Sequence, residues 1–331
     1  MAISVTDPIT PAWNRMVGML FRPFDARKWF TLGFCAFLAM LGEGGGSGNI
    51  GNPGGGGGGG GRGTGRGGGA SGASYTFDMV LDDVKRFVLN NAWWIVPAVI
   101  ALLALVVVLT WVRSRGKFMF LEGVAYDRAA VVEPWKRLRP LGNAFFRFQL
   151  LLIALAFVTV AAVIVFAFVV ALPDIRADRF GGGALTAILV GGIALLVFSI
   201  VFGVIQAIAE DFLVPLMYLR GTGVGPAWRE FRLGILKGNA GSIVVYFLMR
   251  IVLGLAAGVV MAAGMCVTCC IAALPYLSSV IFLPVFVFVR SYSLYFLKQF
   301  GPQYALVVEL PPAPPPGGFP VNMAPPPAQP S

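Results

Sequence analysis

The chain of 331 residues contains no histidine. This absence excludes Ser-His-Asp and Cys-His nucleophilic systems, imidazole general bases and imidazole metal ligands. A metal site would have to be built from carboxylates and the 4 cysteines alone. The sequence therefore predicts no catalytic residue, no cofactor and no metal, and we interpret the protein as non-enzymatic.

Charged side chains are also scarce. They make up 12% of the residues, whereas soluble domains contain roughly 25%. Apolar residues make up 57%, and a soluble fold of this size would expose large apolar patches. We therefore expect an all-α, polytopic membrane helix bundle. The formal net charge of +10 is typical of basic loops on one side of a membrane and predicts no nucleic-acid partner.

Six apolar runs are candidates for membrane spans, each of which needs about 20 residues. They are Trp29–Gly42, Ala92–Val112, Ala144–Leu172, Ala184–Ala209, Ser242–Cys266 and Pro275–Leu297. The first run is short for a bilayer, and the third is long enough to tilt or protrude. The sequence therefore predicts about six transmembrane helices.

Lysine and arginine are concentrated on one side of these spans. The N-terminal segment, the loops 113–143 and 210–241 and the C-terminal side together carry 17, and the loops on the other side carry six. Basic loops remain in the cytoplasm. We therefore expect both termini to be cytoplasmic in a bacterial cytoplasmic membrane.

Three segments begin alike, with a proline and a tryptophan ahead of an apolar run. They are Pro11–Arg15, Pro134–Arg137 and Pro226–Glu230. Each precedes a span, a turn and a returning span. The returning spans also end alike, in the apolar stretches Phe118–Leu121, Phe212–Pro215 and Leu294–Leu297. This pattern predicts three repeated hairpins, each with a short amphipathic cytoplasmic surface helix and a final segment at the membrane interface.

The surface helices carry tryptophan on one face and arginine or lysine on the other. Trp13, Trp135 and Trp228 are therefore candidate interfacial anchors, with membrane lipids and anionic headgroups as partners. The alternative is that each helix simply connects two hairpins and rests on the headgroups.

Low-complexity segments divide the chain further. Residues 1–41 would form the first surface helix and span, and residues 42–76 a disordered glycine-rich external loop. Residues 77–310 would form the helical membrane domain. Residues 311–331 are a proline-rich cytoplasmic tail, either solvated or docked on a cytoplasmic partner.

Polar residues within or beside the apolar runs are candidates for function. They are Arg250, Glu210, Asp211, Gln206 and Arg290. Antiparallel packing of the fourth and fifth runs would bring Arg250 near Glu210 or Asp211. Two interpretations follow: a structural ion pair, or the polar lining of a path for a transported small molecule or lipid.

Cys266, Cys269 and Cys270 lie at the outer end of the fifth run. Two cysteines separated by two residues are typical of thiol-disulfide catalysts, and the external compartment is oxidising. The alternative is that these cysteines only pack in an apolar helix. A membrane thiol-disulfide oxidoreductase that uses Cys266 and Cys269 is therefore a further functional hypothesis.

Three stretches resemble a prokaryotic multipass family known as a domain of unknown function. They are Leu20–Phe30, Glu210–Arg220 and Leu283–Tyr295. The layout is also distantly similar to the membrane domain of some glycerophosphodiester phosphodiesterases, without their catalytic portion. The resemblance covers residues 10–305 and implies a membrane protein with no catalytic residue. We therefore expect an accessory, scaffold or lipid-contacting role, with transport and thiol chemistry as alternatives.

The predicted orientation can be tested with topology reporters. A reporter fused after Pro330 should be cytoplasmic, and one inserted at Gly57 should be external, because the basic loops hold both termini inside. Paired phosphatase and fluorescent-protein fusions measure this. Both positions on the same side of the membrane would contradict the pairing of the first two spans.

Overall fold

The computed structural model describes residues 3–41, 77–176, 181–267 and 274–308, and these are almost entirely helical. The helices are α1 (Ile9–Phe21), α2 (Ala26–Met40), α3 (Phe77–Tyr126), α4 (Val132–Arg137), α5 (Arg139–Arg176), α6 (Gly182–Ile208), α7 (Val214–Arg220), α8 (Val224–Glu230), α9 (Ala240–Val267), α10 (Pro275–Ile281) and α11 (Leu283–Lys298). Two π-helical segments, η1 (Ala209–Leu213) and η2 (Phe231–Leu236), and the 3₁₀ turn η4 (Pro302–Tyr304) complete the described part. The all-α prediction is confirmed.

Four helical segments among the described residues are long and apolar enough to cross a membrane. They are Lys85–Tyr126, Arg139–Asp174, Gly182–Arg220 and Ala240–Cys266. Each has an apolar window of the length that a bilayer core requires. These segments indicate a membrane protein.

The expected first and sixth spans are not among these four segments. Helix α2 has 15 residues, which at 1.5 Å per residue falls short of a bilayer core of about 30 Å. The sixth run is divided into α10 and α11, because Phe282 leaves the helical conformation and Pro284 begins a new first turn. The prediction of six spans is therefore not confirmed.

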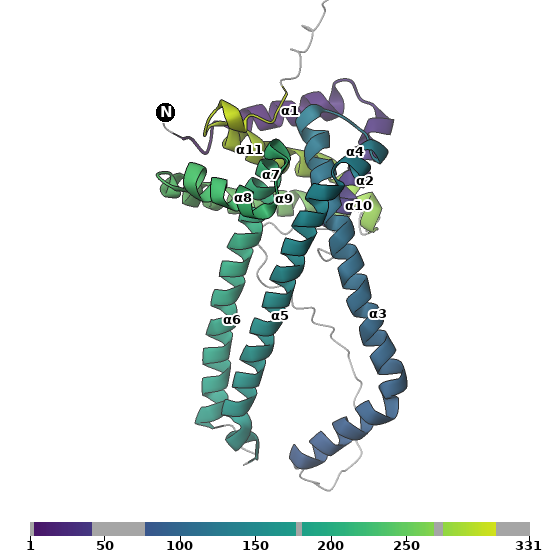
Figure 1. The fold of residues 1–331 in the computed structure, drawn as a ribbon, viewed down its shortest axis with the longest axis vertical. Helices are drawn as coiled ribbons and strands as arrows, with labels where there is room; N and C mark the ends of the chain where they lie inside the picture. Colours follow the sequence, from purple (N-terminus) through teal and green to yellow (C-terminus); the bar gives the residue numbers. More distant parts are fainter. Residues whose placement is uncertain (1–2, 42–76, 177–180, 268–273, 309–331) are drawn as a thin grey trace, which may run out of the picture.

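Most of the shorter helices gather at one end of the molecule, which we call the head. The head consists of α1, α2, α4, α7, α8, α10 and α11. Helices α5 and α6 leave it side by side, and α3 leaves it separately (Figure 1). Large apolar side chains along these three helices are exposed, and Phe157 is an example at 75%. We call the extended parts of α3, α5 and α6 the arms.

The three apolar stretches that end the returning spans lie in the core of the head. Phe118, Phe212 and Phe296, one from each stretch, are all at most 1% exposed. Helices α3, α7 and α11 contact one another directly or through η1, so these stretches face inward. The three helix ends thus pack on one another, and their depth relative to a membrane stays a prediction.

Helix α9 contributes buried residues of one face to the core of the head. Ile243, Tyr246, Ala257 and Met261 are buried in the head core, and their spacing places them on one face of a helix. The opposite face exposes apolar side chains such as Val259, at 70%. In Figure 1, α9 lies at the level of α8, near the upper ends of the arms.

Each of the short helices that carry the predicted tryptophan anchors packs on a different part of the head. Helix α1 packs on α11, α4 on α3, and α8 on η1 and α7. Arg15 fixes α1 further, because its guanidinium donates hydrogen bonds to the carbonyl oxygens of Val124, Ala125 and Val308. These bonds satisfy carbonyls that the end of α3 leaves open. Burial lowers the pKa of Arg15 from its ordinary value.

The contact between α2 and α3 depends on Gly116. A Cβ atom there would lie 2.5 Å from the Leu38 carbonyl carbon and 2.6 Å from the Ala39 nitrogen. Gly116→Ala should therefore push α2 away and lower the free energy of unfolding by about 1–3 kcal/mol, measured by thermal unfolding in detergent. Gly203→Ala is the control, because a Cβ at Gly203 meets nothing within 4 Å. Equal melting temperatures for the two variants would contradict this packing.

Candidate functional site

Charged side chains from four helical segments meet where the arms enter the head. They are Arg113 and Lys117 of α3, Glu210 and Asp211 of η1, Arg250 of α9 and Arg290 of α11. We call these six residues the charge network. Four of them are candidates from the sequence, and Arg113 and Lys117 are additions from the structure.

Asp211 and Arg250 form a buried ion pair. The Arg250 Nη1 atom donates a hydrogen bond to the Oδ2 atom of Asp211. The Arg250 side chain is 12% exposed and the Asp211 side chain is 7% exposed. The Tyr246 hydroxyl donates a second hydrogen bond to the same oxygen, at 2.8 Å. Arg250 Nη1 also donates to the Ala207 carbonyl at 3.3 Å. These added hydrogen bonds offset part of the cost of removing both charges from water.

The Glu210 side chain bonds mainly to cations of α3. Its carboxylate accepts hydrogen bonds from Lys117 Nζ and, at 3.2 Å, from Arg113 Nη2. Arg250 Nη2 lies 3.9 Å from the second carboxylate oxygen. The backbone carbonyl of Glu210 accepts from Arg290 Nη1 at 2.7 Å. One residue of η1 therefore joins α3, α9 and α11.

The two adjacent carboxylates of η1 accept hydrogen bonds from different helices. Successive side chains on a helix point in different directions, so Glu210 faces α3 while Asp211 faces α9. Besides the two carboxylates, the backbone carbonyls of Ala207 and Glu210 accept from arginine. These carbonyls supply acceptors for a group in which cations outnumber acids.

A pair of amides continues the polar groups from the charge network toward the arms. Gln206 of α6 and Gln149 of α5 exchange two hydrogen bonds, at 3.0 and 3.1 Å. Gln206 lies one turn before Glu210 on the same face of its helix. Reciprocal bonding satisfies both amides where little water is present. Gln206 was a candidate from the sequence, whereas Gln149 was not.

Arg113 and Lys117 were assigned to a loop because they follow an apolar run. In the structure α3 continues through them to Tyr126, which turns their side chains toward η1. The signal in the sequence was the apolar stretch Phe118–Leu121, since buried residues beyond the charges imply that the helix does not stop there.

The three predicted tryptophan anchors occupy helices at the same end of the molecule (Figure 1). Trp13 is 56% exposed and lies edge-on to Phe288. Trp135 packs edge-on against Trp111, and the Arg115 guanidinium lies 4.1 Å and 5.1 Å from the ring centroids of Trp111 and Trp135. Contact of these anchors with headgroups stays a prediction.

Of the three redox candidates, Cys266 is a free and exposed cysteine at the end of α9. Cys269 and Cys270 lie outside the residues that the structure describes, as do the glycine-rich segment 42–76 and the proline-rich tail. Thiol chemistry at this end of α9 therefore stays a prediction.

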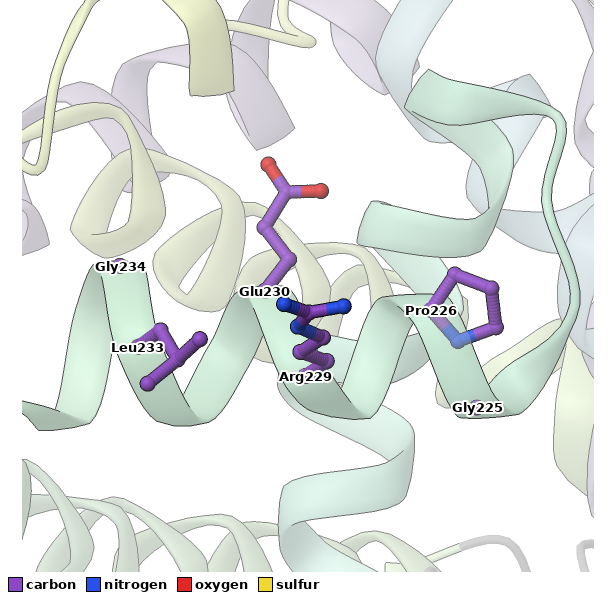
Figure 2. Close-up of a pocket in the computed structure, with 6 residues that line it drawn as sticks. All are labelled: Gly225, Pro226, Arg229, Glu230, Leu233 and Gly234. Carbon is purple, nitrogen blue, oxygen red and sulfur yellow. The ribbon is translucent and has the colours of Figure 1, made fainter.

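A surface pocket lies apart from the charge network, on α8 and η2. Its lining residues are Gly225, Pro226, Arg229, Glu230, Leu233 and Gly234 (Figure 2). Glu230 is held by Arg220, whose Nη2 atom lies 2.7 Å from the carboxylate. The pocket thus combines the exposed cation Arg229, the acid Glu230, which is already paired with Arg220, and the apolar side chain of Leu233.

The model of a family of unknown function (DUF7544) matches residues 3–282. The chain belongs to this family. No curated protein and no solved structure matches the chain. The predicted resemblance to a family of unknown function over most of the chain is confirmed. Membership of DUF7544 supplies no activity.

A double-mutant cycle can measure the coupling between Arg250 and Asp211. Arg250→Ala leaves the Asp211 carboxylate buried without its main cation, and we expect a loss of about 3–5 kcal/mol in the free energy of unfolding. Adding Asp211→Ala should recover part of that loss. Thermal unfolding in detergent measures both. Arg27→Ala, at an exposed cation of α2, is the control and should change little. Strictly additive losses at Arg250 and Asp211 would contradict the coupling.

Proposed function

We propose that the protein is a non-enzymatic, lipid-contacting accessory or scaffold protein of the bacterial cytoplasmic membrane. The observation that carries this proposal is that the charge network bonds internally. Glu210 and Asp211 each accept hydrogen bonds from cations on other helices. Charges that bond one another in this way hold helices together, and a binding site would leave some of them directed at a ligand.

The proposed architecture is three copies of one hairpin unit, with both termini in the cytoplasm. The packing of the surface helices supports the repeat. Helix α4 of the second copy packs on α3 of the first, and α8 of the third packs on η1 and α7 of the second. Helix α1 of the first copy packs on α11 of the third. Each surface helix thus contacts the returning helix of the preceding copy, and the pattern closes into a ring.

The arms support the lipid-contacting part of the proposal. Exposed apolar residues continue along α3, α5 and α6, for example Leu103 at 60%, Val165 at 61% and Ile193 at 61%. Surfaces of this length and polarity are stable only where lipid or another apolar partner covers them. Anionic headgroups at the basic head end, and a cytoplasmic partner for the proline-rich tail, remain part of the proposal.

Transport is a second candidate function, and one observation favours it. The pair of Gln149 and Gln206 extends polar groups from the charge network into the arms. Buried polar groups in series between membrane helices are found along substrate and proton paths. The same pair also serves a scaffold, since two amides that bond each other link α5 to α6.

The two functions differ in how they depend on these amides. The double variant Gln149→Leu/Gln206→Leu replaces both partners by apolar groups of similar size, which costs little stability. A scaffold should therefore remain folded and fully rescue the phenotype of a deletion strain. Rescue and the amount of folded membrane protein are measured together. Thr159→Val, on an exposed part of α5, is the control for a lost polar group.

A double variant that is folded at the normal level but fails to rescue would overturn the scaffold proposal in favour of transport. Arg250→Ala provides the complementary comparison. In a scaffold, its rescue should fall in proportion to its folded amount, because the role of Arg250 is to hold α9 on η1.

A further inference from the structure

Helix α8 and η2 form a continuous amphipathic segment from Val224 to Leu236. Ala227, Phe231 and Ile235 recur every four residues and are at most 1% exposed. They pack this face into the head core. The opposite face exposes two arginines, Arg229 and Arg232, next to an exposed leucine.

The segment lies beside the upper ends of α5 and α6, at the level where their apolar surface ends. In Figure 1, α8 crosses near the upper end of α6. On α6, Val201 and Val204 are 53% and 43% exposed, whereas Ala209, the first residue of η1, is fully buried in the head. An amphipathic helix that lies across membrane helices at the end of their apolar surface lies in the plane of the headgroups.

The charges on this surface are unbalanced in favour of cations. Arg229, Arg232 and Lys237 are exposed. The acid among them, Glu230, accepts hydrogen bonds from Arg220 Nε at 3.1 Å and Nη2 at 2.7 Å, so its charge is already compensated. The surface therefore attracts anions and, within reach of a bilayer, anionic lipid.

The pocket on this surface is amphiphilic. Figure 2 shows Arg229 and Leu233 on the near side of the helix, while Glu230 projects from its upper edge. Leu233 is 50% exposed. Gly225 and Gly234 border the pocket without side chains. The guanidinium of Arg229 can bind a phosphodiester, while the exposed aliphatic side chain of Leu233 can contact an acyl chain attached to it.

We propose that this pocket binds the headgroup of an anionic phospholipid from the surrounding bilayer. Arg229 binds the phosphate oxygens, since a guanidinium offers two parallel donors to a phosphate. Arg232 lies three residues further along the helix and adds a second cation on a neighbouring position. Leu233 contacts the glycerol and the first acyl carbons. The inference rests on the lipid-contacting function proposed above and assigns it to one site.

The test uses the full chain, purified in a neutral detergent. Thermal unfolding is followed while phosphatidylglycerol or phosphatidylcholine is added. Phosphatidylglycerol should raise the melting temperature of the wild type, and phosphatidylcholine should not. Arg229→Gln/Arg232→Gln should weaken the apparent affinity for phosphatidylglycerol on the order of tenfold to thirtyfold, because each cation near an anionic surface contributes about 1 kcal/mol.

The matched control is Arg22→Gln/Arg27→Gln, which removes two exposed cations elsewhere in the head. It should keep the wild-type affinity for phosphatidylglycerol. Leu233→Asn provides a second variant of the site that leaves all charges in place, and it should also weaken binding. Inorganic phosphate alone should not raise the melting temperature.

Several results would overturn the site. They are equal weakening in the control and site variants, an equal effect of inorganic phosphate, or a wild type that does not respond to phosphatidylglycerol. The melting temperatures in phosphatidylcholine report the fold of each variant separately, and rescue of the deletion strain reports the scaffold role. If phosphatidylglycerol binding at this site is not observed but the deletion strain is rescued, the proposed function stands and the site is rejected. If binding is observed but rescue fails, the proposed function alone is rejected.

Discussion

Two adjacent carboxylates, largely withdrawn from water at the junction of the arms and the head, set the main constraint on this structure. Glu210 and Asp211 remain ionised there only if cations reach them in place of solvent. Lys117 approaches from α3 and Arg250 from α9, while Arg290 of α11 binds the backbone of the same segment. The relative positions of three helices, α3, α9 and α11, are thus linked to one short π-helical segment.

The parts of this arrangement that local sequence patterns determine could be predicted. Helices α3, α5 and α6 follow from long apolar runs, because lipid-facing helices need no other signal. The approach of Arg250 to Asp211 follows from charges near the ends of two runs that are consecutive in sequence. Family membership was also recognisable from extended motifs.

Other parts depend on tertiary packing and have no local signature. The six-span prediction treated every apolar run as a span and is not confirmed, since apolar residues of α2 and α11 also form part of the core of the head. Arg15 appeared to be one more basic residue of a cytoplasmic segment, although it is 3% exposed and bonds the end of α3. Lys117 was missed for a similar reason, since its acidic partner lies 93 residues away in sequence.

The order of the charge network along the chain has a consequence for biosynthesis. Arg113 and Lys117 are translated first, the carboxylates of η1 next, and Arg250 and Arg290 last. Glu210 therefore meets its cations as soon as η1 reaches α3, whereas Asp211 must wait for α9. Until then the nascent protein carries one uncompensated carboxylate, which favours water over the interior. Docking of α9 removes that penalty, so the last third of the chain completes a head that the first two thirds can only begin.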